Sequence, residues 1–232
     1  GPGSVSAHPL GNFTVNRYSR IEVYSDKVRV QYVLDMAEIP TFQENSGVDA
    51  NGDGATSGAE AQAYASAKAA VLASNLNLTL NGERAGLTTT VSHASFPEGQ
   101  GGLQTTRITA IYETASSSGT TSLAYSDLNY GDRLGWREIV VLPAAGAQLT
   151  GDYPSQDVSN ALTSYPGDLI SSPLDTTSAA FSFDATAAVA APALSGLAVG
   201  QEAPERSGDA FVSLINTNDL TLGVRFRGAA RC

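Results

Sequence analysis

Short segments that favour β-strands recur along most of this 232-residue chain. They are rich in β-branched and aromatic residues, and clusters of Gly, Asn, Asp, Pro and Ser separate them. In the stretch 27–36, KVRVQYVLDM, apolar Val28, Val30, Tyr32 and Leu34 alternate with other side chains, as in a half-buried strand. The same reasoning predicts further strands at 13–24, 76–80, 87–95, 105–114, 121–127, 137–142 and 179–183. Many strands at short spacing are typical of a β-sandwich.

One stretch departs from this pattern. Residues 58–75, GAEAQAYASAKAAVLASN, are rich in alanine and contain no proline, which favours a helix. A shorter helix is expected at 40–45. Both follow the first two strands of the chain, so they form an insertion. We therefore predict a mainly β fold: an antiparallel β-sandwich with an inserted EF-hand-like helix–loop–helix at about residues 38–75.

The two ends of the chain differ in composition from its centre. Residues 1–4, GPGS, resemble the scar left by tag removal, and Val5-Ser6-Ala7 has the small-x-small pattern at which signal peptides are cleaved. Residues 1–7 are therefore set aside as a tag scar and signal-peptide remnant. Alanine, proline, glycine and serine dominate 185–208. We expect a sandwich domain over 8–184, a flexible linker over 185–208, and a short helix at the start of 209–232, leading toward a membrane region.

Charge and length exclude several classes of protein. The formal net charge is −10, and Lys27 and Lys68 are the only lysines. Nucleic-acid binding needs a basic surface, so no nucleic-acid partner is expected. No apolar run approaches the roughly 18 residues of a membrane helix. Cys232 is the only cysteine, so no internal disulfide can form.

Residues 49–60, DANGDGATSGAE, match the ligand spacing of a calcium-binding loop between two helices. Gly54 falls at position 6, where the chain must turn sharply. A hard divalent cation would relieve the repulsion among the three carboxylates of this loop. The predicted calcium ligands are Asp49, Asn51, Asp53, the carbonyl of Ala55, Ser57 and the bidentate Glu60.

A simpler interpretation of the same residues is a surface turn rich in Asp and Gly that caps the following helix, with Ser57 or Asp53 as the N-cap. Position 8 is Thr56, where paired calcium loops usually carry an aliphatic residue, and no second such loop occurs in the chain. If calcium binds, a single structural ion is therefore favoured over a cooperative sensor.

A transition-metal site is a second candidate. The only histidines are His8 and His93. If the mature chain begins at His8, its α-amine and imidazole together chelate Ni²⁺, Co²⁺ or Cu²⁺, and His93 could complete the site. The alternative is that His8 anchors the first strand and His93 lies on a loop of the sandwich.

Catalytic chemistry finds little support, so no enzyme is expected. A Ser–His–Asp arrangement would have to use one of the two histidines, and no GxSxG pattern is present. Asp127, Asn129 and Asp132 could hold a second cation, or could simply form a turn. Trp136 is expected in the core.

The arginines of the later strands are expected to serve the sheet rather than a site. We predict that Arg107, Arg133 and Arg137 pair with neighbouring carboxylates on the sheet surface.

Several longer segments resemble the extracytoplasmic N-terminal region of bacterial nickel/cobalt transporters of the high-affinity nickel-transport superfamily. In chain order these segments are HPLGNFTVNRYSRIEV from His8, VRVQYVLDMAEIPTFQE from Val28, GQGGLQTTRITAIYE from Gly99, GDRLGWREIVV from Gly131, SNALTSYPGDLISSP from Ser159 and DAFVSLINTNDLTLGV from Asp209.

The resemblance implies a domain outside the cytoplasmic membrane that precedes the membrane-embedded transporter part of the same polypeptide. The family's transport residues lie in those membrane helices, so none is assigned here. The ending RFRGAARC is polar and basic where an apolar segment should begin. The function expected from sequence is thus a calcium-stabilised accessory domain of a nickel/cobalt-type transporter. A secreted calcium-stabilised binding or adhesion module and a periplasmic transition-metal carrier using His8 remain alternatives.

Overall fold

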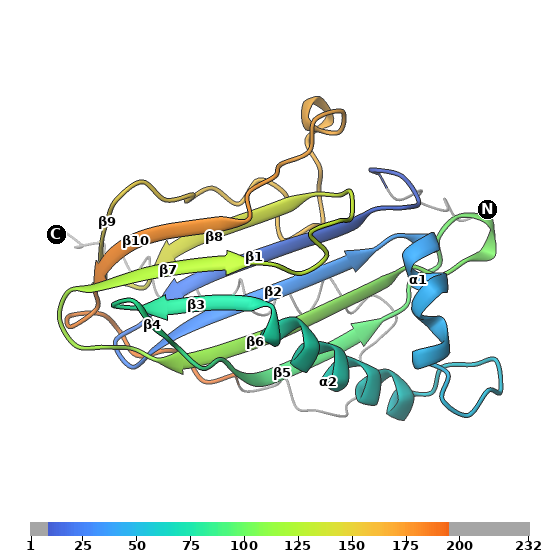
Figure 1. Cartoon of the computed structure of the whole chain (residues 1–232), viewed down its shortest axis with the longest axis horizontal. Coiled ribbons are helices and arrows are strands. Elements are labelled where there is room, and N and C mark those ends of the chain that lie inside the picture. Colours follow the sequence, from blue (N-terminus) through green and yellow to red (C-terminus); the bar gives the residue numbers. More distant parts are fainter. Residues whose placement is uncertain (1–8, 195–232) are drawn as a thin grey trace, which may run out of the picture.

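Two five-stranded sheets pack face to face in the computed structural model, which describes residues 9–194 (Figure 1). The first sheet has the order β5-β6-β2-β1-β8 and the second β4-β3-β7-β10-β9. The predicted mainly β sandwich is therefore confirmed. The strands are β1 (Val15–Val23), β2 (Lys27–Met36), β3 (Leu76–Leu80), β4 (Glu83–Arg84), β5 (Thr88–Ser95), β6 (Thr106–Ala115), β7 (Thr121–Asp127), β8 (Arg137–Pro143), β9 (Gln148–Thr150) and β10 (Ser178–Asp184).

The helices come mainly from the predicted insertion between β2 and β3. They are α1 (Glu38–Glu44), the 3₁₀ turn η1 (Asn45–Gly47) and α2 (Gly58–Ser74); two further 3₁₀ turns are η2 (Gln100–Gly102) and η3 (Gly167–Leu169). Helix α2 packs on β5 through Ala65, Ala69 and Leu72, and the Tyr112 hydroxyl donates to the carbonyl of Ala69. The insert therefore lies against one edge of the first sheet (Figure 1).

One strand pair departs from the antiparallel prediction. β1 pairs with β2 antiparallel but with β8 in parallel, from Arg17 opposite Arg137 to Val23 opposite Pro143. The chain reaches β8 by crossing from β7 in the second sheet, so β8 enters the first sheet in the direction of β1. Gly135 makes the crossing close: a Cβ there would lie 2.3 Å from the carbonyl oxygen of Val15.

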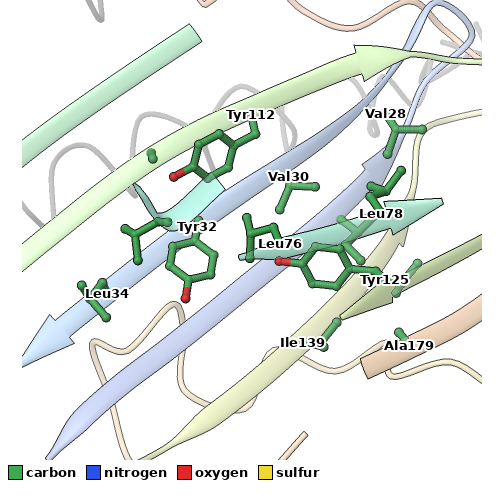
Figure 2. Close-up of a cluster of buried hydrophobic side chains, with 14 of the residues drawn as sticks. Val28, Val30, Tyr32, Leu34, Leu76, Leu78, Tyr112, Tyr125, Ile139 and Ala179 are labelled. Atoms are coloured by element: carbon green, nitrogen blue, oxygen red, sulfur yellow. The ribbon is translucent and has the colours of Figure 1, made fainter. Parts of the chain in front are cut away.

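The core fills the space between the sheets. Alternate residues of β2 point into it, and aromatic rings from both sheets meet there, as Figure 2 shows for Tyr32, Tyr112 and Tyr125. Tyr32 and Tyr112 make an edge contact, with ring centroids 6.4 Å apart. Trp136 is also fully buried, as predicted, but in a second cluster with Tyr18, Val33 and Val140.

The chain after β10 differs from the predicted linker. The linker was expected from residue 185, yet Ala185 is buried and the chain after it is bonded to the sandwich at two points: the Val189 amide donates to Ala145 and the Ala191 amide to Asp26. The remainder of the predicted linker and the helix predicted at the start of 209–232 lie outside the described residues. Within the described range, neither α-helix is long and apolar enough to cross a membrane.

Candidate metal centre

The predicted calcium loop joins η1 to α2, and the carboxylate of Asp49 organises its first half. One oxygen accepts from the amides of Gly52 at 2.8 Å and Asp53 at 3.2 Å, and the other accepts from Gly54 at 2.9 Å. Gly52 and Gly54 both have positive φ, 74° and 83°, a backbone conformation that residues other than glycine rarely adopt. The sharp turn expected at Gly54 is therefore present, and it curls around Asp49.

The next two predicted ligands also fold back on the loop. The side-chain oxygen of Asn51 accepts from the Asp53 amide at 2.8 Å, and a carboxylate oxygen of Asp53 accepts from the Ala55 amide at 2.9 Å. These short-range bonds hold a loop that is mostly exposed to solvent. Side chains of this type favour such turns because they substitute for backbone acceptors.

Glu60, the predicted closing ligand, turns back toward the loop. One carboxylate oxygen accepts from the Asn51 amide at 3.2 Å. The other accepts from the amide and the hydroxyl of Ser57, at 3.0 and 2.8 Å. Hydrogen bonds from the Ser57 backbone and hydroxyl lower the pKa of Glu60, so its carboxylate is ionised and available to a cation. It already contacts residues at loop positions 3 and 9.

The capping interpretation also describes this region correctly in one respect. Ser57 is the N-cap of α2, and with Glu60 at N3 it forms a complete capping box. Asp53, the other candidate N-cap, does not cap the helix. Loop positions 9 and 12 are three residues apart, the same spacing as N-cap and N3. The same two side chains therefore suit both roles.

The oxygen atoms of the predicted ligands are of the type that calcium prefers, but they do not converge on one point in this structure. Within residues 9–194, no group of three or more His, Cys, Asp or Glu side chains is close enough together to hold a metal ion. Both oxygens of Asp49 and of Glu60 accept one or two of the hydrogen bonds given above, and Asp53 accepts one through a single oxygen, whereas an ionised carboxylate has about four acceptor sites. Lone pairs therefore remain for a hard cation that draws these side chains inward.

The loop is anchored on both sides. Val48, which precedes it, is buried with 3 % of its surface exposed. Glu44 at the end of α1 accepts from Lys68 and Tyr64 of α2 and from Tyr130 of the β7–β8 loop. Burial raises the pKa of Glu44, but the bonds from Lys68, Tyr64 and Tyr130 outweigh it and leave the pKa below its ordinary value.

The structure does not describe both histidines of the candidate transition-metal site, so the distance between them is not defined. His8 lies outside the described residues. His93 lies on β5 opposite Thr109, and burial lowers the pKa of its imidazole. The pairing of His8 with His93 therefore stays a prediction.

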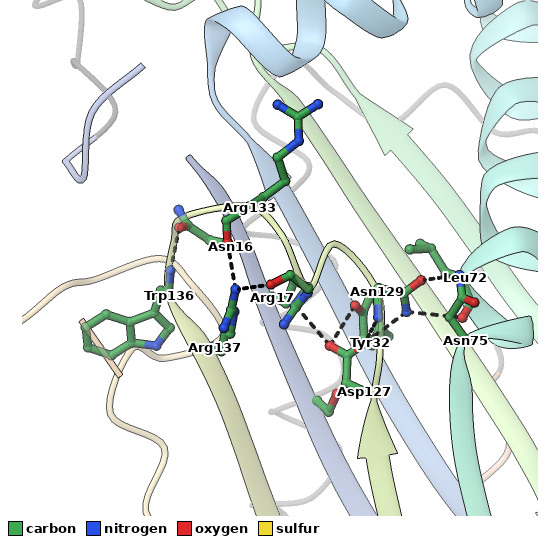
Figure 3. A network of polar contacts seen from close by, with 12 residues as sticks. Asn16, Arg17, Tyr32, Leu72, Asn75, Asp127, Asn129, Arg133, Trp136 and Arg137 are labelled. Atoms are coloured by element: carbon green, nitrogen blue, oxygen red, sulfur yellow. Dashed lines mark hydrogen bonds and ion pairs between the residues drawn. The ribbon is translucent and has the colours of Figure 1, made fainter. Parts of the chain in front are cut away.

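The candidate second cation site is instead a buried hydrogen-bond network (Figure 3). Asp127 lies 3.2 Å from the guanidinium of Arg17 and accepts from the Tyr32 hydroxyl. The side-chain amide of Asn129 donates hydrogen bonds to the Asp127 carboxylate at 3.0 Å and to the carbonyl of Leu72 at the end of α2. The oxygens of Asp127 thus face donors, and exposed Asp132 is no part of this network.

The three arginines expected to pair with carboxylates behave differently from one another. Arg137 contacts Asp175 at 2.8 Å. Arg107 lies 3.8 Å from Asp35, but it is buried, and its guanidinium donates to the carbonyls of residues 161 and 162. Arg133 donates to the side-chain oxygen of Gln43, an amide rather than a carboxylate.

Sequence reasoning missed the buried Glu138. Its carboxylate accepts from the Trp136 indole, from the Val158 amide and from the Ser159 hydroxyl. These bonds fix the start of a turn in which residues 160–162 all have positive φ without being glycine. A buried Glu beside Trp in a strand pattern has no distinctive sequence signal.

Comparison with known proteins adds no assignment. No protein-family model matches the chain. No curated protein matches its sequence significantly.

Proposed function

We propose that this chain is a calcium-stabilised accessory domain that works outside the cytoplasmic membrane, joined to a nickel/cobalt-type transporter. The observation that carries the calcium part is the position of Glu60. Its ionised carboxylate reaches back across the loop to residues 51 and 57, both of which hold predicted ligand positions. A closing bidentate carboxylate at position 12 is the ligand that such loops require.

The role of the ion is to hold the insert in one shape. The loop is exposed and kept together by short-range bonds, whereas the two helices that flank the insert, α1 and α2, are already joined through Glu44 and Lys68, 2.5 Å apart. An ion bound by the loop binds only the folded form and therefore stabilises it. At a free calcium concentration about 100 times the dissociation constant, the added stability is about 2.7 kcal/mol.

An extracytoplasmic location is consistent with this chemistry. Single calcium loops of extracellular modules often bind with dissociation constants of about 10⁻⁴–10⁻³ M, so they are filled where calcium is millimolar. The net charge of −10 favours the approach of cations over anions. The six segments that resemble the transporter family supply the link to a membrane partner.

The end of the sandwich that carries the insert also has features suited to contact with a partner. Phe13, Phe42 and Leu134 are 64, 68 and 79 % exposed. They come from neighbouring segments, because the Val15 amide donates to Leu134 and the Ile39 amide to Asn12. Exposed apolar side chains that gather on one surface often mark protein contacts.

Two experiments test the proposal separately. For the calcium part, thermal unfolding in calcium is compared with unfolding in chelator, and a midpoint that does not change contradicts it. For the transporter part, cells that produce the natural full-length protein are stripped of any outer membrane and treated, with the cytoplasmic membrane intact, with external protease. Cleavage of the domain in membrane-attached protein is expected, whereas protection until the cells are lysed contradicts an outside location.

A further inference from the structure

An asparagine–glycine pair, Asn51-Gly52, lies in the loop between η1 and α2, and both residues are exposed to solvent. In such a pair the backbone nitrogen of the glycine can attack the side-chain amide of the asparagine. The attack is easier before glycine than before other residues, because glycine has no Cβ to obstruct it. The neighbouring groups of the loop bear directly on this reaction.

A carboxylate lies at the proton of the attacking nitrogen. The Gly52 amide donates to Oδ1 of Asp49 at 2.8 Å. A base must lie within hydrogen-bond reach of the proton that it removes, about 2.6–3.2 Å. The Asp49 carboxylate is therefore placed to take this proton as the Gly52 nitrogen becomes a nucleophile.

A backbone donor lies at the carbonyl that would be attacked. The Asp53 amide donates to Oδ1 of Asn51 at 2.8 Å. Negative charge develops on this oxygen when Cγ is attacked, and an N–H group directed at it stabilises that charge. The same amide lies 3.2 Å from Oδ1 of Asp49. The base and the attacked carbonyl therefore adjoin one backbone amide.

The loop also leaves room for the side chain of Asn51 to turn toward Gly52. No described atom beyond the chain neighbours lies within 4 Å of the place where a Cβ on Gly52 would stand. The hydrogen bond that the Asn51 side chain accepts comes from the same exposed loop. Turning this side chain therefore breaks no contact to either sheet.

We infer that Asn51 is a site of self-modification, at which the loop converts this asparagine to aspartate or isoaspartate. Asp49 takes the proton of Gly52, the Gly52 nitrogen forms a bond to Cγ of Asn51, and the Cγ–Nδ2 bond breaks. Nδ2 receives the proton that Gly52 lost and leaves as ammonia, so that a cyclic imide, a succinimide, remains. Water then opens the ring. Cleavage at Cγ gives aspartate, and cleavage at the main-chain carbonyl gives isoaspartate.

Both products change the loop permanently. Each adds a fourth carboxylate to those of Asp49, Asp53 and Glu60, and like charges gathered in one small loop repel one another. Isoaspartate also lengthens the backbone by one methylene group, which shifts the residues after position 51 relative to Asp49. The reaction therefore marks the age of a molecule in the shape and charge of this loop.

A second asparagine–glycine pair provides an internal control. Asn81-Gly82 forms the exposed turn between β3 and β4. The side-chain oxygen of Asn81 accepts from the Ser122 amide at 2.9 Å, and its own amide donates to the Ser122 carbonyl at 2.8 Å. Ser122 belongs to β7, so turning the Asn81 side chain breaks a contact to the second sheet. Asn81 should therefore react more slowly than Asn51.

The test follows both sites in one sample of the full chain, incubated in chelator near neutral pH. Digestion and mass spectrometry measure conversion at each asparagine, and an isoaspartate-specific methyltransferase labels the isoaspartate. In the folded chain we expect Asn51 to convert about fivefold faster than Asn81 or more, the factor that one hydrogen bond is typically worth. In denaturant the two rates should become equal, because neither pair is then held by structure.

Two variants test the base. Asp49→Asn should slow conversion at Asn51 by about tenfold or more, because the new amide accepts the same hydrogen bond but cannot take a proton. Asp53→Ala is the matched control, because it removes one charge from the same loop but keeps the backbone amide and the contact between Gly52 and Asp49. Its rate at Asn51 should stay close to that of the wild type.

Three results would overturn the inference. The first is equal conversion of Asn51 and Asn81 in the folded chain, and the second is a wild-type rate in Asp49→Asn. The third is aspartate without isoaspartate, because direct hydrolysis forms no succinimide. All measurements are made in chelator, so none of these results bears on whether the loop binds calcium.

Discussion

Nε of Arg17 lies 3.2 Å from a carboxylate oxygen of Asp127, and the two side chains are only 2 and 5 % exposed. Arg17 belongs to β1 of the first sheet and Asp127 to β7 of the second, so this ion pair joins the two layers through the core. The Tyr32 hydroxyl donates to the same oxygen at 3.0 Å (Figure 3). Asn129 extends the network to the end of α2.

Replacing Asp127 by Asn should strongly destabilise the protein. The change leaves the buried Arg17 charge without its counter-ion, and breaking one side of a buried pair costs about 3–5 kcal/mol. Chemical denaturation measures the loss of unfolding free energy. Asp175→Asn is the matched control, because the Asp175 side chain that pairs with Arg137 is 69 % exposed. That loss should be at most about 1 kcal/mol, and equal losses in the two variants would contradict the role given to Asp127.

Glu44 should make stability depend on pH in the acidic range. Its pKa in the folded protein lies below the ordinary value of 4.5 because the bonds from Lys68, Tyr64 and Tyr130 outweigh burial. The stabilisation is therefore complete above that ordinary value and is lost as pH falls through the lower folded pKa. Unfolding free energies measured across this range should fall less steeply for Glu44→Gln than for the wild type. Glu83→Gln, at an exposed position in β4, should keep the wild-type slope.

Removing the cap of α2 should weaken the insert even without calcium. Ser57→Ala loses the hydroxyl that accepts from the Glu60 amide and should cost about 1 kcal/mol in chelator. Ser57→Thr keeps a hydroxyl that can accept from the Glu60 amide and donate to the Glu60 carboxylate, so it should stay close to the wild type. If alanine and threonine at this position give the same unfolding free energy, the hydroxyl does not stabilise the helix.

Gly135→Ala should disrupt the crossing into β8. Its Cβ would lie 2.3 Å from the Val15 carbonyl oxygen, a backbone atom that cannot move aside cheaply, and φ is 150°. We expect a loss of about 2 kcal/mol or more in unfolding free energy, as for other backbone clashes in a packed region. Gly167→Ala has open space around its Cβ and should change stability by less than about 0.5 kcal/mol. Similar values for the two variants would show that β8 tolerates a wider crossing.

Glu60→Gln separates calcium binding from helix capping. Glutamine at N3 can still complete a capping box, but it is a neutral amide and a poorer calcium ligand. In chelator the variant should unfold close to the wild type, whereas its calcium affinity should fall roughly tenfold or more. Thermal unfolding with and without calcium distinguishes the two effects. A variant that retains the full calcium-induced shift would remove Glu60 from the ligand set.

Local patterns were the part of this fold that the sequence revealed. The alternation in β2 and the alanine-rich run of α2 each reflect a periodicity within one segment, and both elements lie where these patterns predict them. The Ser57–Glu60 capping box is likewise a three-residue spacing. The parallel pairing of β1 with β8 joins residues more than 100 positions apart in the sequence, so no local pattern could predict it.

Buried charges were the part that sequence reasoning missed. Glu138 stands at a position where a strand pattern suggests a polar side chain facing water, but a long connection covers it. Arg17 stands on the face of β1 that carries Val15 and Ile21, where the pattern suggests an apolar residue, and the core encloses it. The short β4 and β9 carry too few residues for a period to be recognised. For the calcium loop, the sequence could identify oxygen-bearing side chains at suitable positions. It could not show that these side chains fold back onto the loop's own backbone amides.

Calorimetric titration of the wild-type chain with calcium measures directly whether the loop at residues 49–60 holds an ion. We expect one ion bound per chain, with a dissociation constant at or below about 10⁻³ M, and binding weaker by roughly tenfold or more in Glu60→Gln. An absence of binding heat at calcium concentrations well above 10⁻³ M, together with an unchanged thermal midpoint, would contradict it. Residues 49–60 would then be a helix-capping turn and nothing more.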